Sequence, residues 1–221
     1  MTPDKMNTSI AIVGEAKSGK TELASGLMDA LADNGPVAII DDYVDDTMQR
    51  IDGVASFRGN YISNIAIALD RIGLEKHAAV DNETVITVGS LLESSVYSAM
   101  AFESNQQLIN SPEEKSDLLR RVEATLKTMA CFYMDSFYYD FVFYCGPTGL
   151  EQLSELEVQF EKNLQASFQA FALVPVIALP TEGKDIREVT DNRVKAALKA
   201  IEEAENESDA EGSRATPEKA V

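Results

Sequence analysis

Residues 9–21 read Ser-Ile-Ala-Ile-Val-Gly-Glu-Ala-Lys-Ser-Gly-Lys-Thr, an apolar segment that runs into a glycine-bearing loop. The eight residues from Gly14 to Thr21 fit the phosphate-binding pattern G-x-x-x-x-G-K-[ST] at every fixed position. The pattern follows a β-branched strand and opens an amphipathic helix, which is the context that such a loop requires. The sequence therefore predicts a nucleotide-binding P-loop and disfavours a chance match.

Each fixed position of this loop has a chemical reason. Gly14 and Gly19 let the backbone curl so that amide N–H groups face phosphate oxygens. Lys20 is expected to reach the β- and γ-phosphates of ATP, and the Thr21 hydroxyl to ligate Mg²⁺. The helix that follows adds the positive end of its dipole. The candidate nucleotide-binding residues of the loop are Gly14, Glu15, Ala16, Lys17, Ser18, Gly19, Lys20 and Thr21.

Composition narrows the class of protein. A chain of 221 residues with 45% hydrophobic and 25% charged residues suits one α/β domain with a substantial core. The formal net charge of −18 disfavours nucleic acid and anionic membranes as partners, because both need a basic surface. We find no secretory signal and no apolar run of about 20 residues, so we expect a cytoplasmic protein. Formation of a homodimer is left open.

The order of apolar and polar segments predicts the fold. Short apolar runs indicate strands at residues 9–13, 37–40, 84–88, 141–145 and 176–179. Amphipathic patterns indicate helices after the P-loop and at residues 61–77, 90–104, 111 onward, 153–171 and 185–204. This alternation predicts a three-layer α/β/α P-loop NTPase domain with a mainly parallel five-stranded sheet. The domain is expected to span residues 9–205, between a flexible N-terminus (1–8) and a disordered acidic tail (206–221).

Acidic residues that follow the strands are candidates for catalysis and metal binding. Hydrolysing P-loop enzymes usually carry an acid at the end of the strand beside the P-loop strand, expected here to be residues 84–88. That strand ends in Val88-Gly89-Ser90 without an acid, and Glu93 comes one helical turn later. Glu93 either contributes to a Mg²⁺ site or faces solvent.

Asp41 and Asp42 follow the strand at residues 37–40. A carboxylate at this strand end can accept the proton of an acceptor hydroxyl, or align that hydroxyl, during phosphoryl transfer. It can also support Mg²⁺, for which Asp41 is the candidate. The alternative is that both aspartates only solvate the strand end or cap a turn. We expect at least one of them in an active site, and the pattern does not choose between them.

Several patterns resemble the P-loop kinases of nucleosides and nucleoside monophosphates. Residues 37–43 resemble the apolar strand plus Asp-Asp-aromatic segment of uridine-kinase-like and nicotinamide-riboside-kinase-like enzymes. Residues 89–97 occupy the place of the acidic-arginine segment of deoxynucleoside and thymidylate kinases. The resemblance implies Mg²⁺-dependent transfer of phosphate from ATP to a small acceptor, expected to be a nucleoside or nucleotide. It also implies that Thr181 and Arg187 lie where such enzymes hold the base of the nucleotide.

The sequence departs from this family in its arginines. Gly89-Ser90 replaces the acidic-arginine pair, and residues 146–170, where a lid is expected, contain no arginine and only Lys162. An arginine clamp normally stabilises transition-state charge. Arg58, in the loop after the second strand, is the best candidate substitute, whereas Arg71 is explained as a helix-surface pair with Glu75.

These departures keep a second class of function open. A chain without lid arginines could be an ATPase that transfers no phosphate to an acceptor, or a protein whose interactions depend on bound nucleotide. A kinase that acts on a base within DNA is disfavoured by the net charge of −18.

Overall fold

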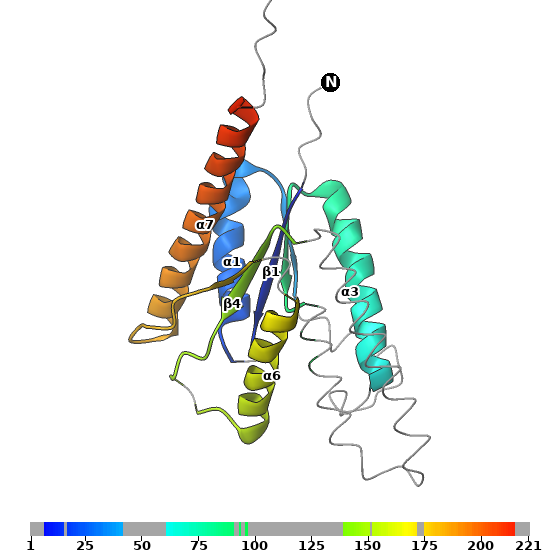
Figure 1. Cartoon of the computed structure of the whole chain (residues 1–221), viewed down its shortest axis with the longest axis vertical. Coiled ribbons are helices and arrows are strands. Elements are labelled where there is room, and N and C mark those ends of the chain that lie inside the picture. The colour runs from blue at the N-terminus through cyan, green and yellow to red at the C-terminus, as the bar shows by residue number, and fades with distance from the viewer. Residues whose placement is uncertain are drawn as a thin grey trace, which may run out of the picture.

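The computed structural model describes residues 7–15, 17–41, 61–90, 93, 96, 139–150, 152–171 and 175–214. In this part of the chain most strands are followed by a helix (Figure 1). The strands are β1 (Thr8–Gly14), β2 (Val37–Ile40), β3 (Thr84–Val88), β4 (Phe141–Cys145) and β5 (Val176–Ala178). The helices are α1 (Lys20–Leu31) with the short 3₁₀ helix η1 (Ala32–Asn34), α3 (Tyr61–Asp81), α6 (Glu155–Phe171) and α7 (Ile186–Arg214).

The five strands form one sheet in the order β2-β3-β1-β4-β5, and all four pairings are parallel. The P-loop strand β1 is central: Ile12 lies opposite Val88 of β3 on one side and Phe143 of β4 on the other. Because all strands point the same way, their carboxyl ends meet at one edge, where α/β proteins bind ligands. The predicted fold class is confirmed, as is the prediction that residues 84–88 neighbour the P-loop strand.

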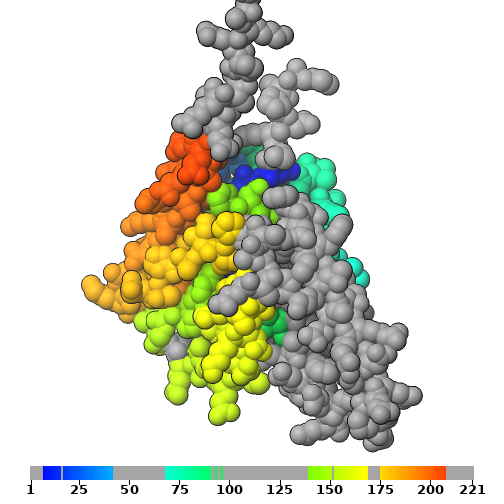
Figure 2. All heavy atoms as spheres, in the orientation of Figure 1, coloured from blue at the N-terminus to red at the C-terminus, as the bar shows by residue number. Residues whose placement is uncertain are grey.

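Helices cover both faces of the sheet, which completes three layers. Ile10 and Ile12 of β1 pack into a core with residues of α1 and α7, including Leu27 and Ile201. The alternate residues of β1, Ala11 and Val13, pack instead with side chains from α3 and α6. Figure 1 shows α1 and α7 together on one side of the sheet and α3 on the other, and Figure 2 shows α6 and α7 at the surface of the face viewed. A strand buried on both faces explains its unbroken apolar sequence.

Two helices extend further than the sequence pattern predicts. The helix expected at 61–77 runs to Asp81, and the one expected at 185–204 runs to Arg214. Residues 206–214 therefore belong to this helix, whereas the sequence pattern predicts a disordered tail from residue 206. Residues 200–211 are rich in alanine and glutamate and contain no proline, and Lys199 pairs with Glu203 at 3.5 Å, so the helix can propagate.

Some sequence predictions fall outside the described residues. Within the helix expected at 90–104, Glu93 and Val96 are helical and the other positions after Ser90 are not described. The helix expected from residue 111 also lies outside the described residues, and the expected domain limits stay predictions. No helix in the described part of the chain has the length and apolar character needed to cross a membrane.

Two glycines provide a matched test of the packing at the end of β1. Gly14 has a φ of 153°, and a Cβ there would collide with the carbonyl oxygen of Cys145 in β4. We expect Gly14→Ala to lower the free energy of unfolding by about 1–3 kcal/mol, because the collision is with backbone. Gly73 lies in α3 with no atom within 4 Å of such a Cβ. Gly73→Ala should therefore raise the free energy of unfolding by about 0.5–1 kcal/mol. Urea unfolding measures both, and a Gly14→Ala variant as stable as the parent chain would contradict this account.

Candidate functional site

The P-loop is a tight turn between β1 and α1. The Ser18 amide and hydroxyl both donate to the Glu15 carbonyl, at 3.1 and 2.7 Å, which closes the turn. Gly19 precedes α1 in a left-handed conformation (φ 80°) and offers no side chain to cap the helix. The first N–H groups of α1 therefore remain available to an anion. Ala16 lies outside the described residues.

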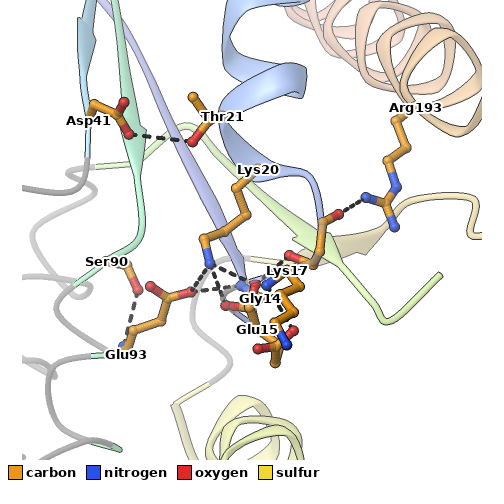
Figure 3. A network of polar contacts seen from close by, with 10 residues as sticks. Gly14, Glu15, Lys17, Lys20, Thr21, Asp41, Ser90, Glu93 and Arg193 are labelled. Atoms are coloured by element: carbon orange, nitrogen blue, oxygen red, sulfur yellow. Dashed lines mark hydrogen bonds and ion pairs between the residues drawn. The ribbon is translucent and has the colours of Figure 1, made fainter. Parts of the chain in front are cut away.

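Lys20 is the cation of this loop. Its buried ammonium donates to the carbonyl oxygens of Gly14 at 2.7 Å and Glu15 at 2.9 Å, so the side chain folds back over the loop (Figure 3). Carbonyl oxygens of the protein thus occupy the donors that the motif assigns to phosphate. A lysine side chain is long and flexible enough to exchange these partners for phosphate oxygens.

Glu93 faces the P-loop and is only 6% exposed. Its Oε1 accepts a hydrogen bond from the Gly14 amide at 2.6 Å and lies 3.9 Å from the Lys20 ammonium. The Glu93 amide in turn donates to the Ser90 hydroxyl at 3.4 Å. Of the two alternatives that the sequence leaves open for Glu93, the solvent-facing one is therefore wrong.

Thr21 and Asp41 meet on the other side of the loop. The Thr21 hydroxyl lies 3.5 Å from Asp41 Oδ1, the outer limit for a hydrogen bond. Thr21 belongs to the first turn of α1, and Asp41 follows β2 at the carboxyl edge of the sheet. The structure thus brings four predicted site residues, Lys20, Thr21, Asp41 and Glu93, to one edge. The candidates Asp42 and Arg58 lie outside the described residues.

The described residues fit a Mg²⁺ ion of the kind found in phosphoryl-transfer enzymes. They contain no group of three or more histidine, cysteine or acidic side chains that could hold a metal by themselves. Mg²⁺ at such sites needs only one or two protein oxygens, because substrate phosphates and water complete its shell. The hydroxyl of Thr21 and the exposed carboxylate of Asp41 are hard oxygen donors of that kind.

Helix α6 approaches the P-loop with acidic side chains. It begins with a capping box, in which the Ser154 amide donates to Glu157 Oε2 at 2.6 Å and the Glu157 amide donates to Ser154 Oγ at 3.3 Å. The ammonium of Lys17, in the P-loop, lies 3.4 Å from Glu157 Oε1. Hydrogen bonds from the backbone and side chain of Ser154 to the carboxylate, together with Lys17, lower the pKa of Glu157 to about 2.

Glu161 lies one turn further along α6 and is buried. Its Oε1 accepts hydrogen bonds from the Tyr144 hydroxyl and from Gln165 Nε2. Burial raises the pKa of Glu161, and the nearby negative charge of Glu15 raises it further. The hydrogen bond from Gln165 lowers the pKa but does not offset the effect of burial. Among the described residues, Glu161 Oε2 and Glu15 Oε1 have no hydrogen-bond partner. The side of the P-loop that faces α6 is therefore acidic, where a lid with arginines would be basic.

Arg71 does not form the surface pair that its spacing to Glu75 suggests. Arg71 is 3% exposed and Glu75 is 1% exposed, and Glu75 Oε1 accepts a hydrogen bond from the Tyr139 hydroxyl at 2.7 Å. A Cβ at Gly89 would lie 2.8 Å from Arg71 Nη1, so the guanidinium sits at the tip of β3. Arg71 and Glu75 follow the buried Ala68 by three and seven residues, so all three lie on one face of the helix. This spacing could have revealed that both charged residues are buried.

Arg193 is a buried residue at this site that the sequence reasoning missed. Its guanidinium donates to the carbonyl oxygens of Ser18 in the P-loop, Gly146 after β4 and Pro180 after β5. Its spacing of four residues from Val189 and Ala197, both fully buried, places it on the inner face of α7. That periodicity was the available signal.

The expected base-binding residues follow β5. A Cβ at Gly146 would lie 3.4 Å from Thr181 Cγ2, so Thr181 lies beside the end of β4. Arg187 is exposed in the first turn of α7. The roles assigned to Thr181 and Arg187 stay predictions.

Comparison with known proteins places this geometry in a fold family. No protein-family model matches the sequence, and no curated protein sequence is significantly similar to it. The chain is similar to the structure of NadR in complex with NAD and AMP-PNP, with a TM-score of 0.63 and 14% identity over 90% of this chain and 49% of NadR. It is also similar to deoxyadenosine kinase from M. mycoides with dCMP and dCDP bound (TM-score 0.55, 16% identity, 87% and 100% of the two chains). A third match is thymidylate kinase from Ehrlichia chaffeensis (TM-score 0.54, 14% identity, 88% and 98%).

These matches show the fold. The chain has the three-layer architecture of the P-loop nucleoside and nucleoside-monophosphate kinases, as the sequence patterns predict. It spans about half the length of the NadR structures. At 11–16% identity the matches do not carry residue roles over to this chain.

Glu157 and Glu161 of α6 should respond oppositely to pH. The pKa of Glu161 is raised in the folded state, so ionisation there opposes folding, and its contribution to stability is lost as pH rises through the raised pKa. Glu161→Gln should therefore unfold at higher urea concentration than the parent chain at pH 8. This gain should disappear as pH falls below about 4.5, where the carboxyl is neutral in both states.

Glu157→Gln is the matched control on the same helix. The pKa of Glu157 is lowered to about 2, so its contribution is present above about pH 4.5 and is lost as pH falls through about 2. This variant should be less stable than the parent chain at pH 8, with the difference shrinking in acid. Equal, pH-independent losses in both variants would show that the two carboxyls do not have opposite pKa shifts.

Proposed function

We propose that this chain binds ATP and Mg²⁺ and transfers the γ-phosphate to a small acceptor, a nucleoside or nucleotide. One arrangement supports this more than any other: Lys20, Thr21, Asp41 and Glu93 converge on the turn at the carboxyl edge of a parallel sheet. A cation, a hydroxyl and two carboxylates around uncapped helix amides supply the groups that phosphoryl transfer requires.

The P-loop would bind the phosphates through its backbone and through Lys20. Amide N–H groups at the start of α1 have no cap, and the helix dipole favours negative charge there. The Lys20 ammonium would leave the carbonyl oxygens of Gly14 and Glu15 and donate to phosphate oxygens instead. The helix amides already lie at the loop, so Lys20 is the donor that must exchange partners before the loop can stabilise charge that develops during transfer.

Thr21 and Asp41 would hold the Mg²⁺ ion, and Glu93 is a further candidate ligand. A bound Mg²⁺ neutralises charge on the phosphates. A carboxylate that holds the metal is a poor proton acceptor in the same step. The contact between Thr21 and Asp41 therefore favours Asp41 for the metal, which leaves Asp42 or Glu93 to align the acceptor hydroxyl and accept its proton.

The structural neighbours support the ligand class. The NadR structure holds NAD and AMP-PNP, and the deoxyadenosine kinase structure holds dCMP and dCDP. These ligands belong to those proteins. They make nucleosides and nucleotides the first acceptors to test on this chain, with the cofactor ATP and Mg²⁺.

One observation favours a second function, ATP hydrolysis without transfer to an acceptor. The side chains that α6 directs towards the P-loop include Glu157 and Glu161, and residues 146–170 contain no arginine. Carboxylates there would oppose the negative charge of a transferring phosphoryl group. An ATPase that signals through conformation needs less stabilisation of an acceptor complex than a kinase does.

Radiolabelled ATP with Mg²⁺ and a panel of nucleosides and monophosphates distinguishes the two functions. We expect label to move to one class of acceptor, and Asp41→Asn to lower the rate by about 10²–10³-fold, the range for loss of one group that stabilises transition-state charge. Asp81→Asn, an equal change of charge at the far end of α3, should leave the rate unchanged. Slow loss of ATP that is indifferent to every acceptor would contradict transfer and support hydrolysis.

A further inference from the structure

Arg193 connects three separate segments of the site with one buried side chain. It is 1% exposed, and Nε donates to the Pro180 carbonyl at 2.8 Å while Nη2 donates to the Gly146 carbonyl at 2.7 Å. Nη1 donates to the Ser18 carbonyl, the contact drawn in Figure 3. Ser18 belongs to the P-loop, and Pro180 begins the segment that carries Thr181.

The charge of Arg193 is buried among neutral partners. All three acceptors are backbone carbonyl oxygens, so no carboxylate cancels the guanidinium charge through these contacts. The charge acts on its surroundings: burial raises the pKa of the Cys145 thiol to about 11, and the positive charge of Arg193 opposes that rise. A Cβ at Gly19 would lie 3.5 Å from Arg193 Nη1, so this charge lies beside the start of α1, where an anion would bind.

Packing alone would not need a guanidinium at this position. Burying a charge costs several kcal/mol of desolvation, and an apolar side chain of similar volume often serves packing equally well. The planar group with its several donors instead fixes directions, since it can hold three carbonyls of different segments at once. It thereby fixes the P-loop relative to the segment after β5.

We infer that Arg193 is a positioning residue that couples phosphate binding in the P-loop to recognition of the nucleotide base by the segment after β5. This inference rests on the proposed binding of ATP. Arg193 contacts the Ser18 carbonyl on the phosphate side and the Pro180 carbonyl on the side where Thr181 is expected to meet the base. Its charge attracts phosphate, and its three hydrogen bonds couple the position of the P-loop to that of the segment after β5.

Binding of two ligands separates the charge of Arg193 from its geometry. Mg²⁺·ATP carries phosphates, ribose and base, whereas Mg²⁺·tripolyphosphate carries phosphates alone, so the ratio of their Kd values reports the contribution of base and ribose. Titration calorimetry on Arg193→Met should show weaker binding of both ligands. The Kd for tripolyphosphate divided by the Kd for ATP should be about tenfold smaller than in the parent chain, which corresponds to about 1.4 kcal/mol of lost coupling. Lys195→Met, an equal charge change at an exposed position of α7, should leave both Kd values unchanged.

Arg193→Lys keeps the charge and loses the three-way geometry, so it should restore tripolyphosphate binding and leave the ratio reduced. It also carries the test if Arg193→Met does not fold, which circular dichroism and urea unfolding would reveal. An unchanged ratio in a folded Arg193 variant, with ATP still bound by the parent chain, would overturn the inference and leave the proposed function intact. A parent chain that does not bind ATP would overturn both.

Discussion

The close approach of β1 and β4 at Gly14 is the constraint on which the rest of the site depends. No Cβ fits between Gly14 and the Cys145 carbonyl, so the chain leaves β1 in a conformation that side chains rarely adopt. From that point the backbone turns within a few residues and begins α1 at Lys20. The helix N-terminus, Lys20 and Thr21 are thereby placed directly above the carboxyl edge of the sheet, where Asp41 also lies.

The electrostatics of the loop follow from this arrangement. Lys20 binds the loop carbonyls and lies near Glu93, so its charge is partly compensated before any ligand arrives. Glu15 and Glu161 add buried carboxylates on the side of α6, while Arg193 adds buried positive charge on the side of α7. An incoming triphosphate would therefore meet attraction from α1 and α7 and repulsion from α6. This asymmetry distinguishes the site from one closed by an arginine-bearing lid.

The sequence predicts the sheet well because parallel strands buried on both faces are short apolar runs, as residues 84–88 illustrate. The contact between Thr21 and Asp41 is foreseeable as well, since the carboxyl ends of parallel strands share one edge. Helical spacing could have indicated which charged residues are buried, but it does not reveal their partners. Arg71, Glu75 and Arg193 have the composition of a solvated helix face, and the acceptors of Arg193 are backbone carbonyls up to 175 residues away in the sequence. A sequence pattern records side-chain types and spacing, and neither reveals such partners.

A crystal structure of the full chain with Mg²⁺ and AMP-PNP tests the central claim most directly, because it shows where the Lys20 ammonium goes when phosphate is present. We expect Lys20 Nζ to leave the carbonyl oxygens of Gly14 and Glu15 for the β- and γ-phosphates. We also expect the Thr21 hydroxyl to turn from Asp41 to the metal. A nucleotide bound elsewhere, with Lys20 still on the loop carbonyls, would contradict the assignment of this loop as the phosphate site.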